Sequence, residues 1–114
     1  MLRSILSMNR NLVVEIHEFS PIEGISDDAL LKALRKAEIS FFRHQLGFLR
    51  CEVLHSENVW FDLAYWQAED IAREAFERFL DHSSRFPLIQ MVSPLTYRRL
   101  YLTRVLTCTG LFSQ

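Results

Sequence analysis

Residues with the chemistry for proton transfer occupy two strand-like segments of this sequence. His17 lies in the alternating segment 11–20, and Asp62 and Trp66 lie in the alternating segment 59–66. Side chains alternate between the two faces of a strand, so these residues share one face if the strands are neighbours. We expect Asp62 to hold His17 in one tautomer, with His17 acting as a proton acceptor.

This arrangement suits removal of a proton from a phenolic molecule that stacks on Trp66, with Trp60 beside it. The alternative is that His17 and Asp62 satisfy each other inside a sheet interface, which is the commoner role of such polar pairs. Glu15 shares the face of His17 and is an alternative acid or base, or an exposed or barrel-facing charge. The sequence leaves these interpretations open.

Aromatic residues supply candidates for the wall of a ligand pocket. We predict that the following rings contact the ligand, although core packing is the commoner role of rings at helical spacing: Phe41, Phe76, Phe79, Trp60 and Trp66.

A second candidate cluster lies on one face of the last strand-like segment, where Arg99 stands between Tyr97 and Tyr101. The guanidinium of Arg99 can donate two parallel hydrogen bonds, which would bind a carboxylate or a quinone oxygen. The alternative for this face is a solvated position at the rim of a dimer.

The remaining reactive residue types do not form a recognisable motif. The other histidines stand near element ends without ligand spacing, and Cys51 and Cys108 have neither metal-like nor redox-like spacing. With three glycines there is no phosphate-binding loop. We therefore predict no metal and no cofactor. For the cysteines we predict two reduced thiols in a cytoplasmic protein, and the alternative is a single disulfide between them.

The pattern of apolar residues predicts six elements in the order strand, helix, strand, strand, helix, strand. Ser26 is expected to cap the first helix, and Gly47 is expected to end it. The predicted ranges are strands 11–20, 48–55, 59–66 and 95–106, helices 27–45 and 69–82, and a short helical turn at 87–91. This order predicts an α+β, ferredoxin-like βαββαβ fold with two helices on one face of an antiparallel sheet.

The first and third strands carry apolar residues on both faces, whereas a sheet with one solvated face shows polar residues there. Something must cover the second face, and we predict a homodimer that pairs through its sheet faces.

Length and charge set the remaining expectations. The 114 residues suit one domain at 11–106, with a leader at 1–10, in which Met8 is an alternative start, and a tail at 107–114. A net charge of −1 gives no basic surface for nucleic acid, and no run reaches transmembrane length. We expect neither nucleic acid nor a membrane as a partner.

The segments VVEIHEFSPIEG, LGFLRCEVLH and VWFDLAYWQAEDIAREAFERF resemble dimeric α/β-barrel proteins of the antibiotic biosynthesis monooxygenase type. The resemblance spans about residues 12–106. It implies a dimeric α/β barrel with a pocket between sheet and helices, and hence a small hydrophobic or aromatic ligand. The alternative that it implies is a cofactor-independent monooxygenase or isomerase acting on an aromatic or quinone-like substrate, with His17 as base.

The same resemblance defines positions at which this chain differs from the family. Trp66 matches a tryptophan of both the haem-degrading and the cofactor-free members. His17 stands where these members have Asn, and Phe76 stands where the haem-degrading members have the iron-binding His. The resemblance therefore implies no haem.

Overall fold

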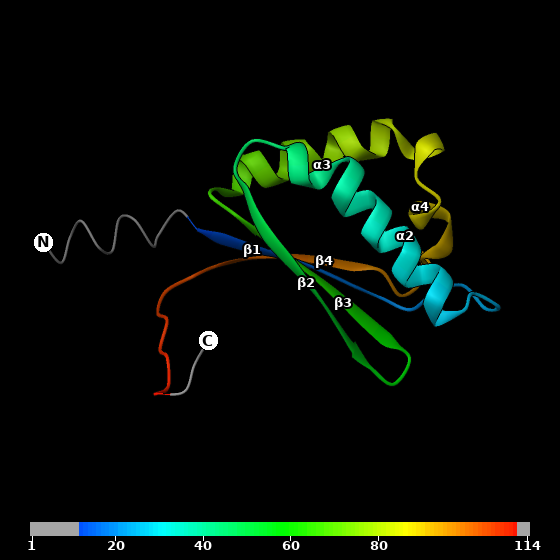
Figure 1. Ribbon diagram of the computed structural model, residues 1–114, viewed down its shortest axis with the longest axis horizontal. Coiled ribbons are helices and arrows are strands. Elements are labelled where there is room, and N and C mark those ends of the chain that lie inside the picture. The colour runs from blue at the N-terminus through cyan, green and yellow to red at the C-terminus, as the bar shows by residue number, and fades with distance from the viewer. Residues whose placement is uncertain (1–11, 112–114) are drawn as a thin grey trace, which may run out of the picture.

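The computed structural model describes residues 12–111, and its elements follow the predicted order (Figure 1). The elements are β1 (Val13–Phe19), α2 (Asp27–Ser40), η1 (Phe42–His44), β2 (Phe48–Ser56), β3 (Val59–Trp66), α3 (Glu69–Asp81), η2 (Ser83–Arg85), α4 (Leu88–Met91) and β4 (Arg98–Thr103). Three predictions lie wholly or partly outside the described residues: the leader at 1–10 with Met8 as an alternative start, the first residue of the strand at 11–20, and the last three residues of the tail at 107–114.

The four strands form one antiparallel sheet in the order β2-β3-β1-β4. The described helices all lie on one face of this sheet, and no described element covers its other face (Figure 1). The predicted α+β, ferredoxin-like βαββαβ fold is therefore confirmed. The register places His17 opposite Asp62 of β3 on one side and opposite Arg99 of β4 on the other.

Helix α2 begins where predicted and ends five residues earlier than predicted. The Ser26 side chain accepts a hydrogen bond from the Ala29 amide at 3.1 Å, which satisfies one of the free donors of the first turn. The helix stops at Ser40 because Phe41 leaves helical geometry (φ −132°) and the next three residues form the turn η1. There Phe41 and Phe42 pack on Phe79 of α3, at ring-centroid distances of 5.4 and 4.7 Å.

Gly47 forms the turn that leads into β2 and does not end the helix. Its φ of +83° is favourable for glycine and unfavourable for other residues. Its carbonyl accepts a hydrogen bond from the Gln67 amide at 2.9 Å, which ties the start of β2 to the end of β3.

The last strand is shorter than predicted. Apolar alternation runs through 95–106, but β4 covers only Arg98–Thr103, and beyond it Arg104 donates one backbone hydrogen bond to Leu12 at 3.1 Å. The chain from Val105 to Leu111 then leaves the sheet (Figure 1). Alternation shows which side chains share a face, but it does not show where the neighbouring strand ends.

The core lies between the sheet and the helices. Trp66, Leu30 and Glu15 are its largest fully buried side chains. The opposite face of the sheet carries apolar side chains that are half-buried or exposed: Val14, Ile16, Leu54, Phe61, Leu63, Tyr65, Leu100 and Leu102. Among residues 12–111, no helix is long and apolar enough to cross a bilayer.

Candidate active site

Glu15 of β1 is a buried carboxylate that is held by three neighbours. Its side chain is 1% exposed. One oxygen accepts a hydrogen bond from the Trp66 indole at 3.0 Å, and the other accepts one from the Tyr101 hydroxyl at 2.8 Å. The Nε2 atom of His17 lies 3.3 Å from this second oxygen. Glu15 thus receives donors from β1, β3 and β4.

His17 has a partner at each ring nitrogen. Its Nε2 faces Glu15, and its Nδ1 lies 2.7 Å from the Tyr97 hydroxyl. When Nε2–H points at Glu15, a neutral imidazole accepts the Tyr97 proton at Nδ1, whereas an imidazolium donates to both partners. Glu15 and Tyr97 therefore hold the ring in place, which is the role that the sequence assigned to Asp62.

Asp62 of β3 lies in the same hollow without contacting either ring nitrogen of His17. Within residues 12–111 its carboxyl group has neither a hydrogen bond nor an ion pair with another side chain, although it is largely enclosed. Burial raises the pKa of Asp62 to about 6; His17 lowers this pKa and Glu15 raises it.

The pKa values of both tyrosine hydroxyls in this cluster are raised. Burial is the main cause for Tyr97 and for Tyr101, and the charge of Glu15 adds to it in both cases. Both therefore remain neutral hydrogen-bond donors at neutral pH.

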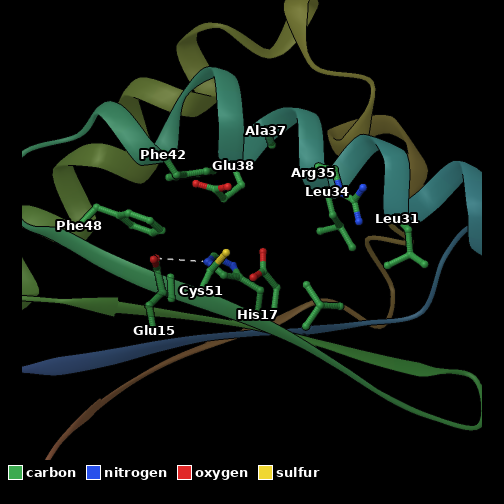
Figure 2. Close-up of a pocket in the computed structure, with 13 residues that line it drawn as sticks. Glu15, His17, Leu31, Leu34, Arg35, Ala37, Glu38, Phe42, Phe48 and Cys51 are labelled. Atoms are coloured by element: carbon green, nitrogen blue, oxygen red, sulfur yellow. Dashed lines mark ion pairs between the residues drawn. The ribbon is translucent and has the colours of Figure 1, made fainter.

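Two adjoining cavities lie between the sheet and the helices. The first, which we call the aromatic chamber, has a volume of about 310 Å³. Its lining includes Phe42, Phe76, Phe79, Tyr97, Leu88 and Val92. The second, which we call the acidic chamber, has a volume of about 260 Å³ and lies between α2 and the strands β2 and β3 (Figure 2). Its lining includes Glu15, Glu38, Asp62, Arg35, Cys51 and Phe48.

The structure brings only some of the predicted site residues to these cavities. His17, Asp62, Phe76 and Phe79 line the aromatic chamber. The other three predicted rings belong to the core: Phe41 packs on Phe79 and Phe86, Trp60 stacks on His55 at 4.2 Å, and Trp66 is fully buried against Phe42 and Phe48. Trp66 acts on the site through Glu15.

The sequence pattern did not identify Glu15 and Tyr97 as the partners of His17. The sequence shows that Glu15 and His17 share one face of their strand, but only the strand pairing shows that Trp66 and Tyr101 both lie next to Glu15. Tyr97 stands just before β4, and its contact with His17 spans 80 positions of the sequence.

Arg99 flanks the aromatic chamber from β4. Its guanidinium lies over the Phe76 ring at 4.4 Å and is exposed to solvent. Cys51 is half-buried, and burial raises the pKa of its thiol to about 11, so the thiol is protonated and unreactive at neutral pH. Within residues 12–111, no three His, Cys, Asp or Glu side chains are grouped to hold a metal ion.

Solved structures share this arrangement of strands and helices. SnoaB, a cofactor-independent oxygenase from Streptomyces nogalater, matches with a TM-score of 0.69 and 20% identity, over 88% of this chain and 99% of that chain. The fold is that of these oxygenases. A monooxygenase from the gene ActVA-Orf6 of Streptomyces coelicolor, solved with the ligand nanaomycin D, matches with a TM-score of 0.64 and 16% identity, over 92% of this chain and 97% of that chain.

The resemblance to monooxygenase-type proteins is thus confirmed at the level of the fold. No family model matches the sequence, and no curated protein matches it.

Proposed function

We propose that the protein binds a small aromatic molecule between its sheet and its helices. The observation that supports this proposal is the aromatic chamber, whose mostly apolar lining includes three polar groups, His17, Tyr97 and Asp62. His17 and Tyr97 are hydrogen-bonded to each other. Its volume of about 310 Å³ lies at the lower end of the range typical of ligand pockets, about 300–1,000 Å³. A bicyclic phenol suits this combination of size and lining.

A second candidate function is cofactor-independent oxygenation or isomerisation, and the chain Tyr97–His17–Glu15 favours it. The hydroxyl of a phenolic ligand bound next to Tyr97 gives its proton to the Tyr97 hydroxyl, which in turn gives its own proton to Nδ1 of His17. Glu15 stabilises the resulting imidazolium. Isomerisation returns this proton to another atom of the ligand. Oxygenation consumes dioxygen: one oxygen atom enters the ring as a carbonyl and the other leaves as water.

The test of both functions uses 1-naphthol, because its oxygenation to 1,4-naphthoquinone consumes one dioxygen and releases one water. Calorimetry measures binding, and an oxygen electrode together with quinone absorbance measures turnover. We expect His17→Gln to abolish turnover and to retain the fold, whereas His44→Gln, at an exposed histidine of η1, matches the unaltered protein. The absence of 1-naphthol binding to the unaltered protein would contradict the first function, and equal turnover in His17→Gln would contradict the second.

We further propose that two copies pair through the open face of the sheet. This face carries apolar side chains on all four strands, and Leu54 and Leu102 are each about half exposed in the protomer. Glu18, Glu52, Arg50 and Arg98 add charges of both signs, which suits a surface that pairs with itself. The two free thiols suit a reducing compartment, and we propose a cytoplasmic location.

A further inference from the structure

The two chambers adjoin each other and share part of their lining. Four residues line both of them: His17 and Asp62 from the sheet, and Leu34 and Phe42 from α2 and η1. A ligand that reaches past these four residues would occupy both chambers.

The chambers differ in chemical character. Rings and aliphatic side chains dominate the aromatic chamber, whereas three carboxyl groups, those of Glu15, Glu38 and Asp62, face the acidic chamber. In Figure 2 the Glu38 carboxylate and the Cys51 sulfur point into this hollow from opposite sides.

Two of these carboxyl groups already have partners. Glu15 accepts hydrogen bonds from Trp66 and Tyr101, and Glu38 forms a two-pronged pair with Arg43 at 2.8 and 3.1 Å. Asp62 has no side-chain partner among residues 12–111, and its oxygens keep access to the cavity, since no side-chain oxygen there is both buried and unpaired. An enclosed carboxyl group without a partner is costly unless a donor reaches it.

We propose that Asp62 anchors a ligand that occupies both chambers, with its aromatic rings in the aromatic chamber and a hydrogen-bond-donating arm that ends in an amine in the acidic chamber. This inference rests on the proposed binding function and adds the class of ligand: an aromatic molecule with a cationic side arm. Asp62 is then a ligand-binding residue, and Glu15 is the partner of His17.

The protonation state of Asp62 supports this assignment. Burial raises the pKa of Asp62 to about 6, so the group is ionised above that pH and accepts a charge-assisted hydrogen bond from an ammonium group. The titratable and charged groups that face it are Glu15 and His17 of β1, Arg35 and Glu38 of α2, Cys51 of β2 and Tyr97 before β4.

The experiment compares three probes by calorimetry at pH 8. They are 1-naphthol, 6-(3-aminopropyl)-1-naphthol, and 6-butyl-1-naphthol, which has the same arm length without the amine. We expect the amine probe to bind about 10- to 100-fold more tightly than the butyl probe, and Asp62→Asn to remove this preference. The matched control Asp81→Asn removes an exposed carboxylate from the end of α3 and keeps the preference.

The outcomes separate this inference from the proposed function. If 1-naphthol does not bind, the proposed function fails. If 1-naphthol binds but the amine and butyl probes bind equally, or if Asp62→Asn keeps the preference, the two-chamber ligand is excluded.

At pH 5 we expect the amine probe to bind about tenfold more weakly than at pH 8, because Asp62 is then mostly protonated, while the butyl probe shows no such loss.

Discussion

A carboxylate buried without donors costs several kcal/mol, and Glu15 avoids this cost through donors from three strands. The same donors connect the core to the site: the Tyr101 hydroxyl bonds the Glu15 oxygen that faces His17, and the Trp66 indole bonds the other oxygen of the same carboxylate. A change at Trp66 or Tyr101 therefore acts on His17 from a distance.

Replacement of Tyr101 by Phe tests this connection. The variant removes one hydroxyl and leaves the Glu15 oxygen facing His17 one donor short, so we expect the free energy of unfolding to fall by about 1–3 kcal/mol. Urea denaturation measures this loss. In a Glu15→Gln background the same replacement should cost less, because the acceptor is no longer charged. Equal losses in both backgrounds would show that the Tyr101 hydroxyl stabilises the protein independently of the charge on Glu15.

Asp62 should make the stability of the protein depend on pH. Its pKa in the folded protein is about 6, above the ordinary value of 3.8, so the folded state binds the proton more tightly than the unfolded state. The contribution of Asp62 to stability therefore falls as pH rises from about 4 to about 6 and does not change further above that range.

The two-unit difference corresponds to about 3 kcal/mol, so Asp62→Asn should stabilise the protein by up to that amount at pH 8 and by little at pH 4. Denaturation of both proteins at these pH values, with Asp81→Asn as control, measures the difference. A gain that is the same at both pH values would contradict this account.

At the scale of elements, the sequence predicted type and order well and predicted ends poorly. Strand β3 (Val59–Trp66) has the predicted bounds, because its alternation is flanked by the polar turn at 56–58 and the acidic start of α3. Helix α2 ends earlier than predicted, and just beyond its end Phe41 and Phe42 pack against Phe79 of α3. Contacts between distant segments, such as this one, are not encoded in local periodicity.

Gly47 and Gly24 form a matched pair for the cost of a side chain at positive φ. Both have φ near +90°, but a methyl group at Gly47 would stand 3.0 Å from Ile71 Cγ2, whereas at Gly24 it would meet no atom within 4 Å. Gly24→Ala should cost about 1–2 kcal/mol from backbone strain alone. Gly47→Ala should cost about 1 kcal/mol more, since Ile71 must shift as well. Thermal denaturation measures both losses, and equal costs would mean that Ile71 yields freely.

The open face of the sheet gives a prediction about assembly. Leu63 lies on β3, one of the two inner strands, and points to this face, so Leu63→Glu places a charge within the proposed interface. We expect light scattering to give the mass of a dimer for the unaltered protein and of a monomer for this variant. The control Ile39→Glu, at an exposed position of α2, should remain dimeric. A monomeric unaltered protein at micromolar concentration would exclude the pairing.

At the scale of the whole molecule, the site was only partly predictable. Strand parity placed Glu15, His17 and Asp62 on one face, because parity is a local property. It did not show that the helices cover this face, where Glu15 is buried and is neither exposed nor barrel-facing. Whether Asp62 or Glu15 meets the imidazole depends on side-chain positions that two further strands fix. The large rings were ambiguous for the same reason: Phe76 and Phe79 line a cavity, while Phe41, Trp60 and Trp66 fill the core.

The exposed segment that follows β4 offers a protease test of the proposed pairing. Val105, Leu106 and Leu111 are 77–96% exposed in the protomer, on a stretch of chain without strand or helix. Chymotrypsin, which cleaves after large apolar residues, should cut an isolated protomer after Leu106 long before it reaches the core. A second copy that pairs through the open face of the sheet and contacts residues 105–111 would slow this cleavage. The rate of this cleavage, followed by mass spectrometry across a dilution series, would then report how much of the protein is paired.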